Sequence, residues 1–245
     1  MIELQELHKS FGKGRVVALR GASFTARDGE ITGLLGPNGA GKTTTLRVLG
    51  TVLAADRGRA LVDGLDAAAE PLEVRARLGM LPHAPGLYPR LTPREHIRYF
   101  GQLHGLQGAE LRRREDELVR LLEMGEEADR RVEGFSQGQR LRVAIARALV
   151  HGPHNVVLDE PTAGLDVQGT RAMRRLITRL KEEGHCVLFS SHVMQEVSAL
   201  CDRVVVMARG AVVADGTLEE LRRRTGRDDV EDAYVAAIGS PEVLA

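Results

Sequence analysis

Short apolar or alternating runs, the pattern of β-strands, recur in the first third of the chain and again after residue 155. They predict strands at residues 2–7, 16–19, 22–25, 31–35, 60–62, 78–81, 156–158, 186–189, 204–207 and 211–213. Helical periodicity lies between them and predicts helices at residues 41–49, 72–77, 167–183 and 194–200. Strands that alternate with helices favour a parallel sheet covered on both faces.

The middle of the chain shows helical periodicity and no strand pattern. Three helices are predicted there, at residues 93–104, 109–124 and 137–149. We therefore expect a single domain in which a helical subdomain, residues 84–152, is inserted into an α/β core formed by residues 1–83 and 153–221. Residues 222–245 carry a basic run and then an acidic cluster, so we expect a C-terminal appendage that is either helical or a loose tail.

Composition restricts the class of protein without identifying it. With 245 residues, 43% of them hydrophobic, the chain can bury the core of one large domain. Lys plus Arg and Asp plus Glu both number 34, so no nucleic-acid partner is expected. Cys186 and Cys201 lack metal-ligand spacing and are interpreted as reduced thiols of a cytosolic protein. Because no targeting segment opens the chain and no apolar run reaches roughly 18 residues, we expect any membrane function to require a partner.

A glycine-rich motif follows the predicted strand at residues 31–35 and opens the next helix. It reads Gly36-Pro37-Asn38-Gly39-Ala40-Gly41-Lys42-Thr43 and matches G-x-x-x-x-G-K-[ST]. Backbone amides in such a loop, with the N-terminus of the helix, cradle the β- and γ-phosphates of ATP. Lys42 should bridge these phosphates, the Thr43 hydroxyl should ligate Mg²⁺, and Thr44 should donate to the α-phosphate. The alternative, a glycine turn without a ligand, gives Lys42 and Thr43 no packing role.

Polar side chains end two of the later strands. Asp159 is expected to hold Mg²⁺, directly or through water, and Glu160 to polarise the water that attacks the γ-phosphate. His192 follows the strand at residues 186–189 and is expected to hydrogen-bond the γ-phosphate. Paired acids at a strand end are often a solvated turn, and a lone histidine is often structural. Both assignments therefore depend on the phosphate loop, which should lie at the same edge of the sheet.

The order of these motifs over residues 4–221 resembles that of the ATP-binding subunit of an ABC transporter. The resemblance implies an α/β fold with a P-loop NTPase core: a parallel sheet, an N-terminal antiparallel β portion and an inserted helical subdomain. It also implies that two copies form a homodimer around two Mg-ATP molecules, open after hydrolysis, and drive a separate transmembrane permease. Such a subunit would be cytoplasmic and peripheral on the inner face of the cell membrane.

The same resemblance assigns further site residues. Phe11 would stack on adenine, and Asp166 would link the two ATP sites across the dimer interface. The segment at residues 135–139 would clamp the ATP held by the opposite subunit, through Ser136, Gly138 and Gln139 at the start of a helix. Simpler roles stay open, namely a core side chain for Phe11 and helix capping for Ser136 and Asp166.

Two positions depart from the family's usual pattern. Gln137 stands where the clamp usually has glycine, so we expect the clamp to survive with altered fit. His83 stands where the family usually has a glutamine that contacts Mg²⁺ and water and links the core to the helical subdomain. Imidazole is a poorer partner for a hard cation. We expect His83 to keep the link to the subdomain and to weaken or reroute the metal contact.

Within the family, residues 85–92 and 190–197 resemble ATPases of ABC-2 type exporters, including the sodium-export group, so export of sodium or a drug is expected. Residues 85–92 would form part of the groove that receives a cytoplasmic helix of the permease; an exposed loop is the alternative. Two other functions stay open, a soluble non-transport ABC ATPase and a nucleotide-dependent switch with low turnover. The chain carries neither the second cassette nor the long coiled-coil insertion usual in the soluble class.

Overall fold

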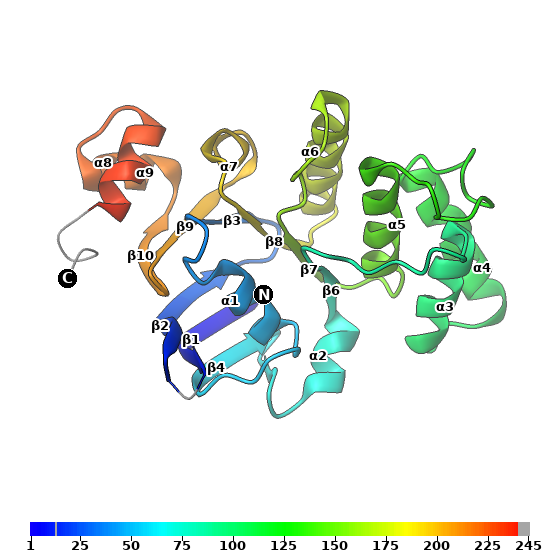
Figure 1. The fold of residues 1–245 in the computed structure, drawn as a ribbon, viewed down its shortest axis with the longest axis horizontal. Coiled ribbons are helices and arrows are strands. Elements are labelled where there is room, and N and C mark those ends of the chain that lie inside the picture. Colours follow the sequence, from blue (N-terminus) through cyan, green and yellow to red (C-terminus); the bar gives the residue numbers. More distant parts are fainter. Residues whose placement is uncertain (13, 240–245) are drawn as a thin grey trace.

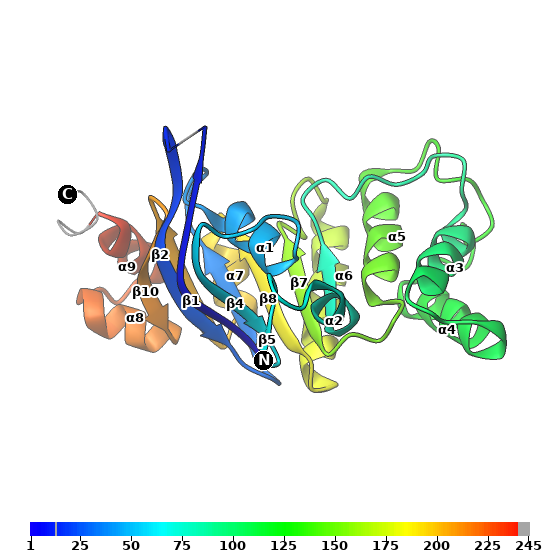
Figure 2. The same cartoon turned by 90° about the horizontal axis from the view of Figure 1, so that it is seen from below.

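Two sheets and a separate group of helices make up the fold (Figures 1 and 2). The computed structural model describes residues 1–12 and 14–239. It confirms the α/β class predicted from the sequence. Part of the expected C-terminal appendage, residues 240–245, lies outside the described residues.

The larger sheet has six strands in the order β10-β9-β3-β8-β7-β6. All neighbours run parallel except β10, which pairs antiparallel with β9 at the edge. Every residue of β3, β7 and β8 is buried, including the polar residues at the ends of β7 and β8, and their apolar positions form short runs in the sequence. The strands are β3 (Ile31–Leu35), β6 (Leu78–Leu81), β7 (Asn155–Asp159), β8 (Cys186–Ser191), β9 (Arg203–Ala208) and β10 (Ala211–Gly216).

The smaller sheet is antiparallel, in the order β2-β1-β4-β5, as expected for the N-terminal portion. Its strands are β1 (Ile2–Phe11), β2 (Val16–Ala26), β4 (Arg57–Val62) and β5 (Leu65–Asp66). The prediction of two strands at residues 16–19 and 22–25 was wrong, because β2 is continuous through Gly21. Register shifts against β1 absorb the irregularity there. β5 was not predicted, since two residues are too short to show a period.

Four helices pack on the sheets, and three lie together at the far end of the molecule (Figure 2). The first four are α1 (Lys42–Leu49), α2 (Pro71–Arg77), α6 (Val167–Glu182) and α7 (Met194–Leu200); the other three are α3 (Pro93–Leu103), α4 (Gly108–Leu121) and α5 (Gln137–Leu149). The described part of the C-terminal segment is helical, with α8 (Leu218–Thr225) and α9 (Val230–Ile238). Within the described residues, no helix combines the length and the apolar character needed to cross a bilayer.

Alternate residues of the six-stranded sheet enter two separate cores. Leu188 and Val205 pack with the antiparallel sheet and α1 on one face. Phe189 and Val206 pack with α5, α6 and α7 on the other. The two cores form because successive side chains of a strand point to opposite faces of the sheet. With both faces covered, the sheet and its carboxyl edge are held in place. The phosphate loop, Asp159, Glu160 and His192 lie at the ends of strands at that edge.

Candidate functional site

The glycine-rich loop at residues 36–43 joins β3 to α1, as predicted. Gly41 has a φ of 106°, in the left-handed region that favours glycine, and a Cβ there would lie 2.7 Å from the Ala18 carbonyl oxygen. A Cβ on Gly36 would overlap the Met207 carbonyl oxygen. The loop therefore packs backbone to backbone against β2 and β9, and a larger residue would displace it.

The N-terminus of α1 offers free amides to an anion. The first hydrogen bond of the helix runs from the Thr45 amide to the Gly41 carbonyl at 2.9 Å. The amides of Lys42, Thr43 and Thr44 come before this bond and are available to a ligand. No side chain among the described residues caps this end. Amides of this kind, together with the helix dipole, attract phosphate. Of the other loop residues, Pro37, Asn38 and Gly39 are exposed and Ala40 is buried.

The ammonium of Lys42 is folded over this loop and is only 5% exposed. Its Nζ donates to the carbonyl oxygens of Gly36 (2.6 Å) and Pro37 (3.3 Å), and lies 3.7 Å from Glu160 Oε1. Burial lowers the pKa of Lys42, against the opposing attraction of the Glu160 and Asp159 carboxylates. Phosphate oxygens would compensate this buried charge more fully than carbonyl oxygens do, so the position fits the predicted phosphate bridge.

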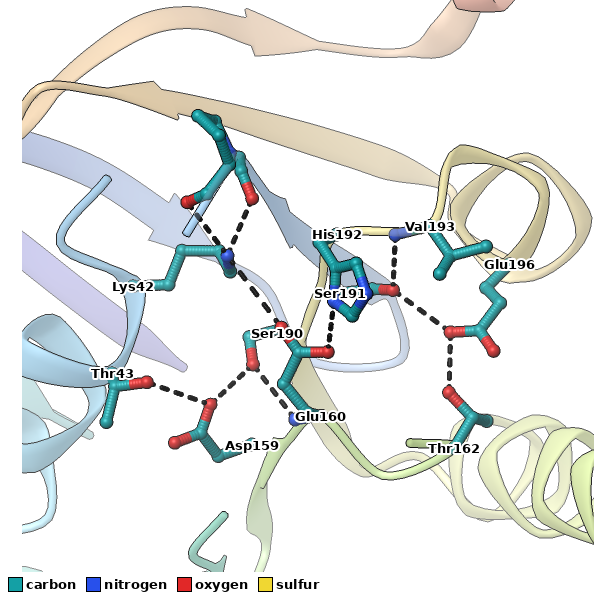
Figure 3. Close-up of polar contacts among 12 residues, drawn as sticks. Lys42, Thr43, Asp159, Glu160, Thr162, Ser190, Ser191, His192, Val193 and Glu196 are labelled. Atoms are coloured by element: carbon teal, nitrogen blue, oxygen red, sulfur yellow. Dashed lines mark hydrogen bonds and ion pairs between the residues drawn. The ribbon is translucent and has the colours of Figure 1, made fainter. Parts of the chain in front are cut away.

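Asp159 lies at the end of β7, 3% exposed, and faces Thr43 at the start of α1. Its Oδ1 accepts hydrogen bonds from Ser190 Oγ at 2.6 Å and, weakly, from Thr43 Oγ1 at 3.5 Å (Figure 3). A hydroxyl and a carboxylate directed at each other are the hard oxygen donors that Mg²⁺ prefers. The residues present therefore fit the predicted metal.

Glu160 is held between two other predicted site residues (Figure 3). Its Oε2 lies 2.7 Å from Nδ1 of His192, while Oε1 faces Lys42 Nζ. The Glu160 side chain is 11% exposed and that of His192 is 50% exposed. Glu160 has a φ of 54°, a left-handed conformation uncommon outside glycine, and its amide donates to Ser190 Oγ at 3.0 Å. Strain of this kind often occurs where a side chain must be aimed at a reacting group.

Ser136 and Gln139 of the predicted clamp, and also Asp166, take part in helix caps in the described chain. Ser136 and Gln139 make a capping box: Ser136 Oγ accepts from the Gln139 amide at 3.2 Å, and Gln139 Oε1 accepts from the Ser136 amide at 2.9 Å. Asp166 caps α6 by accepting from the Gly169 amide at 2.7 Å. Gly138 lies half-buried in the first turn of α5. Helix capping, the simpler role considered for Ser136 and Asp166, is therefore present. The contacts of these residues with ATP stay a prediction.

Gln137, the departure from glycine, is turned toward its own chain. Its Nε2 donates to the Ala163 carbonyl at 2.8 Å, and its amide group packs directly on Gly164. The side chain is thereby held on the loop between β7 and α6. Within residues 1–12 and 14–239, no hydrogen bond or ion pair joins residues 135–139 to residues 36–44. One copy does not bring the clamp to its own phosphate loop.

Two predicted residues stand apart from this cluster. Phe11 lies at the end of β1, paired with Val16 in the β1–β2 hairpin, and is 39% exposed, so it is not a core side chain. Lys9 Nζ lies 5.7 Å from the centre of its ring. His83 is exposed just after β6, and its ring makes no hydrogen bond or ion pair with any other described residue. The expected link of His83 to the helical subdomain stays a prediction.

Three residues with clear contacts at the site were not predicted from the sequence. Ser190 joins Asp159 to the Glu160 amide, while Thr162 and Glu196 form a buried contact beside His192. Ser190 pairs with Asp159 across β7 and β8. The sequence shows Ser190 only as a hydroxyl at the end of a strand, because its contact with Asp159 depends on β8 lying beside β7. A carboxylate inside the following helix gives no comparable signal.

Comparisons with known proteins agree with this geometry. A family model described as ABC transporter matches residues 19–163. The chain is 42% identical to the ABC transporter ATP-binding protein NatA of Bacillus subtilis (strain 168), over 97% of this chain and 98% of that protein. It is 37% identical to the doxorubicin resistance ATP-binding protein DrrA of Mycobacterium tuberculosis (strain CDC 1551 / Oshkosh), over 96% and 73%.

Solved structures share the fold. One, the ATP-binding subunit of an ABC transporter, superposes with a TM-score of 0.88 at 30% identity, covering 97% of this chain and 99% of the other. Another is a dimeric, post-hydrolysis state of the ATP-binding cassette MJ0796 bound to ADP and Pi. It superposes with a TM-score of 0.80 at 26% identity, covering 89% and 98%.

Proposed function

Because the chain belongs to the ABC transporter family, as the ATP-binding and ATP-hydrolysing subunit of an exporter, we propose that two copies close around two Mg-ATP molecules to drive a separate permease. Both relatives are ATP-binding proteins of transport or drug resistance, which argues against the nucleotide-dependent switch and the soluble non-transport ATPase considered above. Those two alternatives are therefore abandoned.

The observation that carries the proposal is the position of Glu160. One carboxylate oxygen faces Lys42 Nζ at 3.7 Å and the other faces His192 Nδ1 at 2.7 Å, beside the free amides of α1. A water molecule beside this carboxylate would be oriented for in-line attack on the γ-phosphate, with Glu160 accepting its hydrogen bond. Lys42 would exchange its carbonyl contacts for β- and γ-phosphate oxygens, and His192 would hydrogen-bond the γ-phosphate.

Thr43 and Asp159 would hold the magnesium ion, and Thr44 would donate to the α-phosphate. When bound, Mg²⁺ neutralises charge on the phosphates and orients them. Phe11 would stack on adenine, for which its exposed ring is suited. His83 would sit near this site with a weakened or rerouted metal contact.

The second copy would complete each site. Ser136, Gly138 and Gln139 would present the N-terminus of α5 to the γ-phosphate held by the opposite subunit, and Asp166 would link the two sites. Support comes from the separation of clamp and phosphate loop within one chain and from the dimeric ADP-bound neighbour. The helical part, residues 84–152, would then act as the lobe that carries the clamp to its partner.

The permease would dock on the helical lobe. Tyr88, Tyr99 and Leu103 are exposed there (49%, 43% and 65%), and Tyr88 and Tyr99 pack edge to face with ring centres 6.0 Å apart. Exposed apolar side chains gathered in this way are typical of a binding surface. The subunit would then be cytoplasmic, on the inner face of the cell membrane. The cargo would be sodium or a drug, in keeping with the drug-resistance relative.

A Glu160→Gln variant tests the proposal. It should lower the rate of phosphate release at least about 100-fold, because a neutral amide cannot accept a proton from water, while ATP binding persists. An exposed glutamate on α4 supplies the matched control, and Glu110→Gln should hydrolyse ATP at the wild-type rate. Unchanged phosphate release by the Glu160 variant would remove Glu160 from this role.

A further inference from the structure

A buried carboxylate lies behind the catalytic pair and has no role in the function proposed above. Glu196 is in the first turn of α7 and is 8% exposed. Its Oε2 accepts hydrogen bonds from Thr162 Oγ1 at 2.6 Å and from Ser191 Oγ at 3.0 Å (Figure 3). Thr162 comes two residues after Glu160, and Ser191 directly precedes His192. One oxygen atom therefore joins the two chain segments that carry the pair.

The Ser191 hydroxyl also fixes the backbone on the other side of the histidine. It accepts a hydrogen bond from the Val193 amide at 3.0 Å while donating to Glu196. Since a hydroxyl has one proton to donate, this proton is committed to the carboxylate. Ser191 is 1% exposed, so water cannot readily replace either contact. The backbone of His192 is thus held on both sides.

The ring of His192 depends on this support. It is half exposed, and its one hydrogen bond to another described residue is with Glu160. A side chain so exposed keeps a defined orientation only if its backbone is fixed. Displacement of a reacting group by about 1 Å can lower a rate about 100-fold.

We propose that Glu196 is a positioning residue for ATP hydrolysis: through Ser191 and Thr162 it holds His192 at hydrogen-bonding distance from Glu160. The inference rests on the proposed function, because the pair matters to catalysis only if the protein hydrolyses ATP at this site. Within residues 1–12 and 14–239, Glu196 makes no hydrogen bond or ion pair with residues 36–44 or 135–139. Its removal should therefore affect the chemical step and leave nucleotide binding in place.

Kinetics of the full-length protein test this inference. Glu196→Ala should lower kcat between about 10- and 100-fold and leave KM for ATP within about threefold, because the pair is loosened and the phosphate loop is not. Glu196→Gln retains an oxygen that can accept at least one hydroxyl, so its loss of kcat should be smaller. The matched control is Gln195→Ala on the same helix, an exposed residue that contacts Glu231 and should keep the wild-type kcat.

A double-mutant cycle separates positioning from a merely structural role. If Glu196 acts through His192, the Glu196→Ala/His192→Ala double variant should turn over within about twofold of His192→Ala alone. A further loss of about tenfold in the double variant would overturn the inference, as would wild-type kcat in Glu196→Ala. If Glu196→Ala fails to fold, Thr162→Val and Ser191→Ala serve in its place, because each removes one of the two hydroxyl donors to Glu196. Each should lower kcat by an intermediate amount and leave KM unchanged. Wild-type kcat in both variants would overturn the inference.

The same experiments distinguish this inference from the proposed function. Impaired His192→Ala with normal Glu196→Ala would overturn the positioning role alone. Wild-type turnover in both His192→Ala and Glu160→Gln would overturn the assigned roles of the pair and, with them, the inference.

Discussion

Ser190 offers the sharpest test of how the site is held together. Its hydroxyl is fully buried, donates to Asp159 Oδ1 at 2.6 Å and accepts from the Glu160 amide at 3.0 Å. Ser190→Ala removes both contacts while leaving the Cβ in place. The Asp159 carboxylate then loses a bond worth about 1.5–3 kcal/mol, and the Glu160 amide is left without its partner.

We expect Ser190→Ala to lower the free energy of unfolding by about 3 kcal/mol. With a urea m-value of about 2.5 kcal/mol/M, the unfolding midpoint should fall by about 1 M. The loss should also reach catalysis, because Glu160 has a φ of 54° and its amide bond to Ser190 helps hold that conformation. Turnover should fall about tenfold or more.

Urea unfolding and phosphate release, measured on the same preparations, check both expectations. Ser198→Ala on α7 is the control, because Ser198 is an exposed residue whose hydroxyl donates to the Met194 carbonyl of its own helix. It should change stability by about 0.5 kcal/mol or less. If Ser190→Ala unfolded at the same urea concentration as Ser198→Ala and hydrolysed ATP normally, Ser190 would not organise the two acids.

Three further changes should have measurable effects. Burial lowers the pKa of His151 to about 4, whereas in the unfolded chain this histidine binds a proton as pH falls below about 6.5, so the folded state loses stability towards pH 4. Between pH 7 and 5, the free energy of unfolding of the wild type, measured in urea, should therefore fall by about 2 kcal/mol more than that of His151→Phe. Parallel pH curves for the two proteins would contradict this. His83→Gln should alter ATP turnover or its pH dependence, and no change in either would refute a role for His83 at the metal. Gln137→Ala removes the hydrogen bond to the Ala163 carbonyl. The affinity of ATP-driven dimerisation, measured by sedimentation, should fall about fivefold, the equivalent of about 1 kcal/mol. A dimerisation affinity equal to that of the wild type would show that this contact does not hold the clamp.

The motifs predicted to bind nucleotide could be placed in the fold from the sequence because their chemistry is local. Gly36 to Thr43 must form a tight turn between a strand and a helix, and that requirement restricts the residues at fixed spacing. Asp159 and Glu160 end an apolar strand, so their place at the edge of the sheet followed from the strand pattern. The helical insertion was equally visible, since helical periodicity persists over many residues.

Contacts that depend on strand order were beyond such reasoning. Ser190 meets Asp159 only because β8 lies beside β7 in parallel register, and Glu196 meets Thr162 only because α7 follows β8 back over the sheet edge. The continuous β2 was missed because Gly21 interrupts its alternation locally, while pairing with β1 carries the strand through. Tertiary pairing decides such cases, and a single sequence does not encode it in a local pattern.

The most direct test of the central claim is the mass in solution of Glu160→Gln, saturated with Mg-ATP. Sedimentation should give twice the 26.7 kDa chain mass with Mg-ATP and a single chain mass without nucleotide, because in the proposed dimer the clamp of each copy would bind the ATP held by the other. A protein that stays strictly monomeric with Mg-ATP, both alone and with the proposed permease, would contradict the shared ATP site.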